Sequence, residues 1–138
     1  MSNDSLIAYM LDTNIVSHFL RGNQAVIDKV LSISMNTLCI SAITEAELYY
    51  GLAKNPTARR LQELVHEFLI RVDIIPWDST AAITYGKLRA KMQVQGLSLG
   101  NLDMLIAAHA LALDIVLVTN DKAFSFIKAL HCQDWTVL

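Results

Sequence analysis

Three acidic residues in this sequence are placed so that their carboxylates could meet in one metal-binding site. Asp12 directly follows an apolar run, Asp121 follows the strongly apolar run 115–119, and Asp103 lies in an apolar segment after a glycine-containing loop. Carboxylates held together repel by about 1 to 4 kcal/mol per pair at about 4 Å, depending on the local dielectric. They stay ionised only where a cation joins them, and hard oxygen ligands select Mg²⁺ or Mn²⁺. Such an ion activates water and stabilises a phosphate under attack, so the pattern indicates phosphodiester hydrolysis.

Each of these acids also has a structural interpretation that does not involve chemistry. Asp12 could be the N-cap of a helix that begins at Asn14, and the same two interpretations apply to Asp121. Asp103 lies near the start of a helix, where the helix dipole favours an acid. Its neighbours are so apolar, however, that the helix is expected to be buried nearly all round, and a buried charge needs a partner or a metal. The functional interpretation is therefore favoured most for Asp103.

Glu47 is the acid for which the local pattern favours a structural role. Thr44 and Glu47 fit a capping box, in which the threonine caps the helix and the glutamate reaches back to it. Glu45 points away from Glu47, because residues two apart lie on different faces of a helix. From the local pattern alone, Glu47 is predicted to be a capping residue.

Alternating strands and helices are expected to position these acids. Strands are predicted at 7–11, 38–41, 72–75, 115–119 and near 135–138. Helices are predicted at 14–20, 25–33 and 44–53, and from 55–56 onward past Leu69. Further helices are predicted from a cap at Ser79 or Thr80 to about Gln95, with Asp78 as an alternative cap, at 102–113, and around Phe124 and Ile127. Strands joined through helices form a mostly parallel sheet covered on both faces, which is an α/β fold. Ligands bind beyond the carboxyl ends of such strands, where the strand order reverses.

Composition is compatible with one packed domain over residues 1–138. The chain is 54% hydrophobic and 17% charged, which is too apolar for a disordered protein. Its net charge of −2 counts mildly against a nucleic-acid binder, but that objection weakens if four acids are neutralised at a metal site. The polar start of the chain lacks the pattern of a signal peptide, and no apolar run is long enough for a membrane span. A cytoplasmic protein with Cys39 buried and reduced is expected.

Several other classes of site have no support in the sequence. The nucleotide-binding glycine motifs and the nucleophilic serine motif GxSxG do not occur. His18, His66 and His131 show no ligand spacing with one another or with a cysteine, which argues against a zinc site. His109 lies six residues after Asp103 and is expected to be a hydrogen-bonded or interface histidine rather than a ligand.

Four short motifs span nearly the whole chain. They are Met10-Leu11-Asp12-Thr13-Asn14, then Ile43-Thr44-Glu45-Ala46-Glu47-Leu48 with Tyr50-Gly51, then Gly100-Asn101-Leu102-Asp103 continuing to Ala110, and finally Leu117-Val118-Thr119-Asn120-Asp121. In these motifs and their order the sequence resembles the PIN-domain family, and within it the VapC toxins of type II toxin–antitoxin pairs. The resemblance implies a PIN-like three-layer domain with a central, mostly parallel sheet of about five strands flanked by helices. The proline often found before the motif's glycine is replaced by Leu97-Ser98-Leu99 in this chain.

The resemblance also implies a function and a set of site residues. It implies Mg²⁺-dependent endonucleolytic cleavage of RNA, often tRNA or rRNA, with Mn²⁺ as a substitute. It further implies a homodimer and a VapB-like antitoxin that blocks the site in a hetero-oligomer. The family's acids match Asp12, Glu47, Asp103 and Asp121 as catalytic and metal-binding residues, which overrides the local interpretation of Glu47. Asn14 and Thr119 would support them. The candidates for contact with the RNA backbone are Lys87, Arg89, Lys91 and Lys122.

Three competing functions remain open at this point. A receiver-type phosphoacceptor module would need paired acids after the first strand, whereas Asp12 stands alone. A haloacid-dehalogenase-type phosphatase would need a second aspartate where this chain has Asn14. A catalytically silent PIN scaffold that only binds partners is the third alternative, and an activity assay distinguishes it.

Overall fold

A single parallel sheet organises the protein, whose computed structural model describes residues 6–137. The five strands are β1 (Tyr9–Leu11), β2 (Leu38–Ser41), β3 (Asp73–Ile75), β4 (Val116–Val118) and β5 (Cys132–Gln133). They run in the order β3-β2-β1-β4-β5, and every neighbouring pair is parallel. The expected mostly parallel sheet is confirmed.

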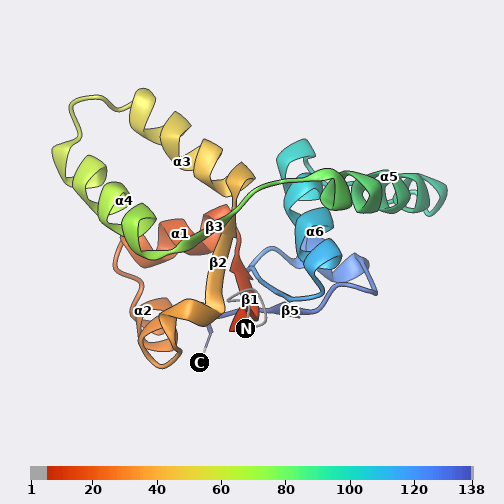
Figure 1. Ribbon diagram of the computed structural model, residues 1–138, viewed down its shortest axis with the longest axis horizontal. Coiled ribbons are helices and arrows are strands. Elements are labelled where there is room, and N and C mark those ends of the chain that lie inside the picture. Colours follow the sequence, from red (N-terminus) through yellow and green to blue (C-terminus); the bar gives the residue numbers. More distant parts are fainter. Residues whose placement is uncertain (1–5, 138) are drawn as a thin grey trace.

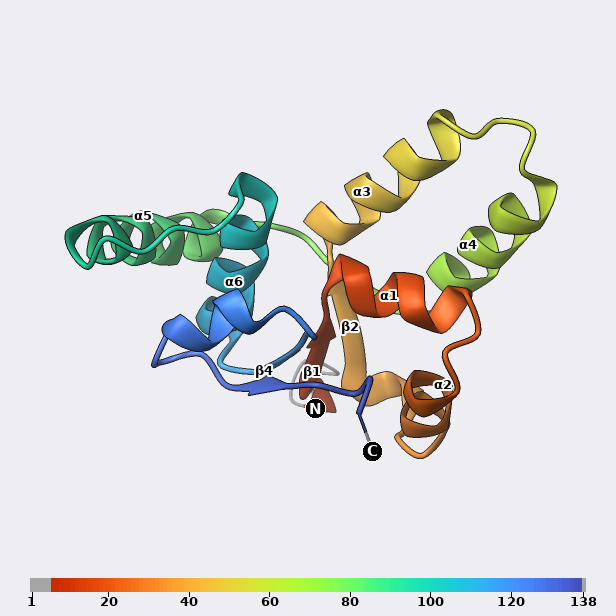
Figure 2. The same ribbon diagram turned by 180° about the vertical axis from the view of Figure 1, so that it is seen from behind.

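Helices cover the two faces of the sheet and make the fold three-layered (Figure 1). On one side lie α1 (Thr13–Leu20), α2 (Gln24–Leu31), α3 (Ala42–Ala53) and α4 (Arg59–Arg71), with the 3₁₀ turn η2 (Met35–Thr37) before β2. On the other side lie α5 (Ser79–Val94), α6 (Asn101–Leu113) and the 3₁₀ helix η3 (Lys122–Phe126). Seen from behind, α3 and α4 extend away from the sheet on one side and α5 on the other (Figure 2).

Two apolar cores follow from this layering. Successive residues of a strand point to opposite faces, so Leu11 joins the core under α1 to α4 while Met10 joins the core under α5 and α6. Both side chains are fully buried. Cys39 is also buried, with a free thiol, as expected.

The strand order reverses between β1 and β4. From β1 the chain moves outward through β2 to β3, and it then returns to place β4 on the opposite side of β1. The Asp12 N–H continues the β1–β4 pairing by donating to the Val118 carbonyl at 3.0 Å. The crevice at these two carboxyl ends is therefore the place where a doubly wound sheet binds ligands.

The last predicted strand was placed wrongly. The fifth strand is Cys132–Gln133, and residues 135–137 form no strand, while Leu138 lies outside the described residues. Trp135 is instead 4% exposed in the core, with its ring 5.3 Å from that of Tyr9. Its indole N–H donates to the Gln133 side chain at 2.9 Å. An aromatic residue that favours strands by propensity thus serves here as a core anchor after the strand has ended.

Two helix starts also differ from the prediction. The long amphipathic helix begins at Arg59, because residues 55–58 form a turn closed by the Ala58 N–H on the Asn55 carbonyl at 3.1 Å. The cap of α5 is the alternative residue Asp78, whose carboxylate accepts from the Ala81 N–H at 3.1 Å, and not Ser79 or Thr80. No helix within residues 6–137 has both the length and the apolar character needed to cross a membrane.

Candidate active site

Asp12 lies at the point where β1 ends and α1 begins. It is only 3% exposed, and its Oδ1 accepts a hydrogen bond from the Ile15 N–H at 2.8 Å. It is therefore the N-cap of α1, so the structural interpretation of this residue is correct. The cap uses only Oδ1 of the carboxylate, so it does not prevent a second role for Asp12 in the crevice.

The electrostatic surroundings of Asp12 are unfavourable for a charge. Burial raises the pKa of this carboxyl to about 6, with the nearby charges of Asp103 and Asp121 adding to the rise and hydrogen bonds from Thr119 and Ile15 opposing it. Among the described residues the only ion pair joins Arg71 and Glu67 on the exposed face of α4. No basic side chain therefore compensates Asp12, and a cation would relieve the cost of ionising it.

Asp103 approaches the same crevice from the first turn of α6. Burial raises its pKa first of all, and the charges of Asp121 and Glu47 raise it further. Its Oδ2 lies close to the backbone of Gly100: a Cβ atom at position 100 would be 3.6 Å from this oxygen. The α6 helix is apolar and largely buried from Met104 to Ala110, as its sequence predicts. The mutual influence of the acids indicates that the topology gathers them at one edge of the sheet.

Glu47 is not a capping residue, and the local prediction for it was wrong. The N-cap of α3 is Ser41, whose hydroxyl accepts from the Ile43 N–H at 3.0 Å, so Glu47 falls in the second turn of the helix. Its Oε1 instead accepts a hydrogen bond of 2.6 Å from the hydroxyl of Thr13. The buried hydroxyl of Thr44 lies 3.2 Å from that of Thr13. Glu47 thus faces the start of α1, next to Asp12.

Asp121 and Thr119 complete the crevice after β4. Asp121 caps η3 by accepting from the Ala123 N–H at 2.9 Å. The Thr119 hydroxyl accepts from the Asp121 N–H at 3.1 Å, and Thr119 itself is 4% exposed. Thr119 therefore contacts both flanking acids. Asn14 is exposed on α1 and lines a pocket of about 340 Å³ together with Glu47.

The donor set fits a hard divalent cation that keeps part of its water shell. All the candidate ligands are carboxylate oxygens, which such ions prefer. Over residues 6–137, no three acidic, histidine or cysteine side chains stand close enough together to form a complete ligand group. Mg²⁺ commonly retains several waters and takes only one or two protein carboxylates, so an open cluster around Asp12 and Asp103 suits it.

A buried polar network next to the crevice belongs to the scaffold. His109 is 1% exposed, and its Nδ1 lies 2.8 Å from the hydroxyl of Ser41. Burial lowers the pKa of His109, although a hydrogen bond to the Pro76 backbone and the charge of Asp78 act in the other direction. A neutral ring that donates to the Pro76 carbonyl accepts from Ser41. His109 is thus hydrogen-bonded within the scaffold, as predicted.

The sequence analysis missed two residues that position the side chains of the site, Thr13 and Ser41. Thr13 holds Glu47, and Ser41 holds both the start of α3 and His109. Thr13 lies within the first motif, and its position directly after Asp12 was the available signal. Ser41 ends a buried strand, where a fully buried hydroxyl requires a partner.

The four basic candidates do not form one group. Lys87 and Lys91 line a pocket that also includes Lys128, between α5 and η3. Arg89 lies on a different face of α5, where it donates to the Tyr85 hydroxyl at 3.0 Å and lines a separate pocket against the loop 97–101. Lys122 is exposed at the start of η3, directly after Asp121.

Comparisons with known proteins identify the family and the fold of this chain. The family model of the PIN domain matches residues 9–130. The chain is 38% identical over 130 residues to ribonuclease VapC2 of Rickettsia felis, covering 92% of this chain and 97% of that protein. It is 31% identical over 132 residues to the tRNA(fMet)-specific endonuclease VapC of Shigella flexneri, covering 95% and 100%. The crystal structure of VapBC2 from Rickettsia felis bound to a promoter DNA fragment contains a similar chain, with a TM-score of 0.87, 35% identity and coverage of 94% and 99%.

Proposed function

This chain belongs to the PIN-domain family of VapC ribonucleases, and we propose that it is the endoribonuclease toxin of a type II toxin–antitoxin pair. One observation carries the proposal. Asp12 is buried at the switch point of the sheet with a pKa raised to about 6. The charges of Asp103 and Asp121 contribute to that rise, and no basic side chain among residues 6–137 forms an ion pair with Asp12. Such an arrangement is costly for stability and useful for binding a cation.

In the proposed site, Asp12 and Asp103 hold Mg²⁺, for which Mn²⁺ can substitute. When bound, the ion supplies Lewis acidity towards water and neutralises charge that develops on the phosphate. Glu47 and Asp121 complete the shell or orient water, with Thr119 and Asn14 as supports. The Thr13 hydroxyl occupies Oε1 of Glu47, which leaves the other carboxylate oxygen available to accept a proton from water.

The proposed substrate is RNA of the tRNA or rRNA class. The similarity to a tRNA(fMet)-specific endonuclease over the whole length of that protein supports this assignment. Structured RNA is recognised largely through its shape and its phosphates, so basic residues outside the acidic crevice must contribute to binding. Lys87, Arg89, Lys91 and Lys122 are the proposed contacts.

The proposed partners are a VapB-like antitoxin and a second copy of this chain. Similarity to the VapC chain of a VapBC2 crystal structure supports the antitoxin. Large apolar side chains are exposed on the side of the sheet that carries α1 to α4, among them Leu31 at 76%, Tyr50 at 65% and Ile70 at 76%. Apolar residues left open in this way are typical of surfaces that a protein partner covers. The comparisons do not favour a receiver-like module.

The substitution Asp103→Asn tests the nuclease proposal. Cleavage of a tRNA pool in the presence of Mg²⁺ should be lost, because the amide cannot supply the charge that holds the ion. Thermal stability without metal should be equal or higher, since one carboxylate repulsion is removed. The matched control is Asp114→Asn, an exposed residue with φ of 54° at the end of α6, where asparagine is well tolerated.

Unchanged RNA cleavage by the Asp103 variant would reject the site assignment. The toxin role is tested separately by expression in bacteria, where the wild type should arrest growth and Asp12→Asn should not. If both are equally harmless, the toxin role fails, whereas the nuclease activity measured in solution can still stand. Absence of cleavage by the wild-type protein would favour a catalytically silent scaffold.

A further inference from the structure

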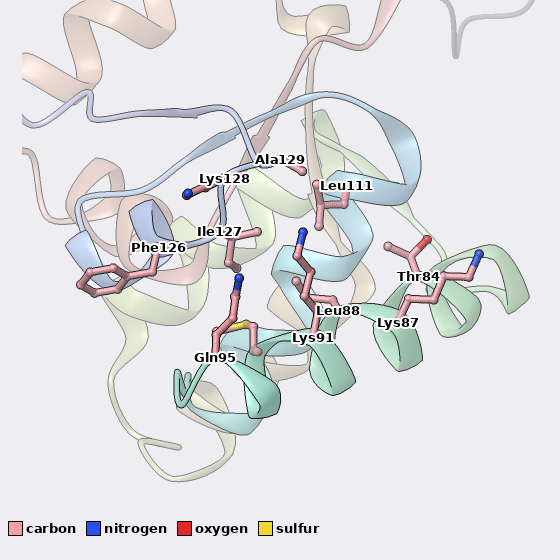
Figure 3. Close-up of a pocket in the computed structure, with 11 residues that line it drawn as sticks. Thr84, Lys87, Leu88, Lys91, Gln95, Leu111, Phe126, Ile127, Lys128 and Ala129 are labelled. Carbon is pink, nitrogen blue, oxygen red and sulfur yellow. The ribbon is translucent and has the colours of Figure 1, made fainter.

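A pocket bordered by lysines lies between α5 and η3, away from the acidic crevice. Its volume is about 220 Å³, and its floor is formed by Leu88, Met92, Leu111 and Ile127. Figure 3 shows Gln95 reaching from α5 toward Ile127 and Lys91 reaching between Ile127 and Leu111, with Phe126 and Lys128 on one side of the pocket and Lys87 on the other. We call this site the lysine pocket. It combines a hydrophobic floor with a cationic rim.

The lysines of this pocket are not neutralised by the protein. None of the lining residues is acidic, and in the described part of the chain no ion pair involves Lys87, Lys91 or Lys128. From Ser79 to Gln133 the sequence contains five basic side chains and only three acidic ones, two of which are Asp103 and Asp121. This half of the chain, with its acidic crevice neutralised by a metal, therefore presents positive charge to a polyanion.

Phe126 gives the pocket an aromatic side chain that is not packed in the core. Its side chain is 61% exposed, whereas its neighbour in η3, Phe124, is 1% exposed in the core. Aromatic rings beside a cationic groove are the usual platform on which bases of single-stranded nucleic acids stack. The volume is below the roughly 300 to 1,000 Å³ that drug-sized ligands occupy, which suits one ring-sized group rather than a larger molecule.

The 3₁₀ helix η3 connects the pocket to the acidic crevice. Asp121 caps η3 at one end, and Phe126 is the last residue at the other. At about 2 Å of rise per residue, the five residues of η3 span about 10 Å. A strand of RNA that follows η3 would therefore pass from the carboxylates to the lysine pocket.

We propose that the lysine pocket is a nucleotide subsite that binds one unpaired base of the substrate RNA through Phe126 and the neighbouring phosphates through Lys91, Lys128 and Lys87. This inference rests on the proposed nuclease function and adds to it a requirement for an unpaired nucleotide next to the cleaved bond. Proteins bind the bases of structured RNA mainly where these are unstacked, in loops and at ends. The subsite would therefore direct cleavage to a loop or an end rather than to a double-helical part of the RNA.

Binding of a short, fluorescently labelled single-stranded RNA tests the charge of the pocket. The double variant Lys91→Gln/Lys128→Gln should weaken binding and lower the slope of log Kd against log salt concentration by about 1.4, since each phosphate contact to a single strand contributes about 0.7. The matched control is Lys29→Gln/Lys54→Gln, which removes the same charge from exposed lysines on α2 and at the end of α3. The control should leave the slope unchanged.

The substitution Phe126→Ala tests stacking in the same assay. Removal of the ring should weaken RNA binding about 5- to 150-fold, the range expected for the loss of one stacked base. Phe126→Trp should retain binding, and both proteins should fold normally because the side chain is mostly exposed. A photoreactive uridine in the same RNA should crosslink to Phe126 or to an adjacent residue, as located by mass spectrometry.

The possible outcomes separate this proposal from the proposed function. If the wild type cleaves RNA and the pocket variants bind and cleave like the wild type, the subsite is rejected while the nuclease stands. If the pocket variants lose RNA binding although the wild type cleaves nothing, the subsite stands and the nuclease is rejected. If RNA binding is unchanged but the oligomeric state changes, the pocket is a protein interface and the proposal is overturned.

Discussion

Contacts between residues far apart in the sequence determine how the individual side chains of the crevice are oriented. Thr13 and Glu47 are 34 positions apart, yet the hydroxyl of one donates to the carboxylate of the other at 2.6 Å. The short helical pattern around Glu47 could suggest only a capping role, because the partner of its carboxylate comes from another helix. For Asp12 the position after a strand predicted its place in the crevice, because the carboxyl end of a parallel strand lies there, but this position left open whether it caps a helix or binds a metal.

The substitution Thr13→Val measures what the orientation of Glu47 contributes. Valine keeps the shape of the side chain but cannot donate, so Glu47 loses a charge-assisted hydrogen bond typically worth about 1.5 to 3 kcal/mol. For the proposed nuclease we expect the cleavage rate to fall about 10- to 100-fold, with little change in the melting temperature because Glu47 is only half-buried. Thr13→Ser should restore most of the activity. Equal cleavage by the valine variant would show that Glu47 needs no such support.

The helices and strands around the crevice are joined by the network of Ser41 and His109. Ser41 ends β2 and caps α3, His109 belongs to α6, and Pro76 follows β3. The network thus ties four elements together: β2, α3, α6 and the end of β3. The sequence predicted nearly all the elements, because apolar periodicity is strong in most of them. It misplaced the last strand near 135–138, because the two-residue β5 is too short to produce a pattern and is fixed only by pairing with β4.

The substitution Ser41→Ala should destabilise the protein by about 1 to 3 kcal/mol at pH 7. It leaves the Ile43 N–H without its cap and the buried His109 ring without its partner. Urea unfolding is the measurement, with an unchanged dependence on denaturant as a check for two-state behaviour. Ser34→Ala is a suitable control, because the Ser34 hydroxyl is exposed and bonds only to nearby Asn36. Equal stability of the two variants would mean that the network is dispensable.

At the scale of the whole molecule, the crevice reduces the stability of the metal-free protein. The folded-state pKa of Asp12, about 6, is above its ordinary value of 3.8, so between these pH values the folded protein binds more protons than the unfolded chain. The stability that this group contributes is present below about pH 4 and is lost as the pH rises through about 6. A shift of this size corresponds to about 3 kcal/mol.

We therefore expect Asp12→Asn to gain stability relative to the wild type as the pH rises from 4 to 7 in the absence of metal. Asparagine still caps α1, so the comparison isolates the charge. Chemical unfolding at both pH values gives the measurement. Addition of Mg²⁺ at pH 7 should stabilise the wild type but not the variant, because only the wild type binds the ion in its folded state. A stability difference that does not vary with pH would contradict the burial of a charged Asp12.

The global arrangement was predictable to the extent that topology rules apply. Alternating elements imply a parallel sheet, and a parallel sheet implies a crevice at its switch point, which is where Asp12 and Asp121 lie. The lysine pocket was not predictable in the same way. It depends on how α5 crosses α6 and on where η3 leaves β4, and no periodic pattern reports either angle.

The wide spacing of Asp12, Glu47, Asp103 and Asp121 along the chain has a consequence for protein synthesis. During translation Asp12 leaves the ribosome 109 residues before Asp121, the acid that follows β4. Before β4 is made, β1 pairs only with β2, and the side of the crevice that β4 forms is absent. A nascent toxin without β4 would therefore not cleave the RNAs of the ribosome that synthesises it. Cleavage would begin only after β4 has paired with β1.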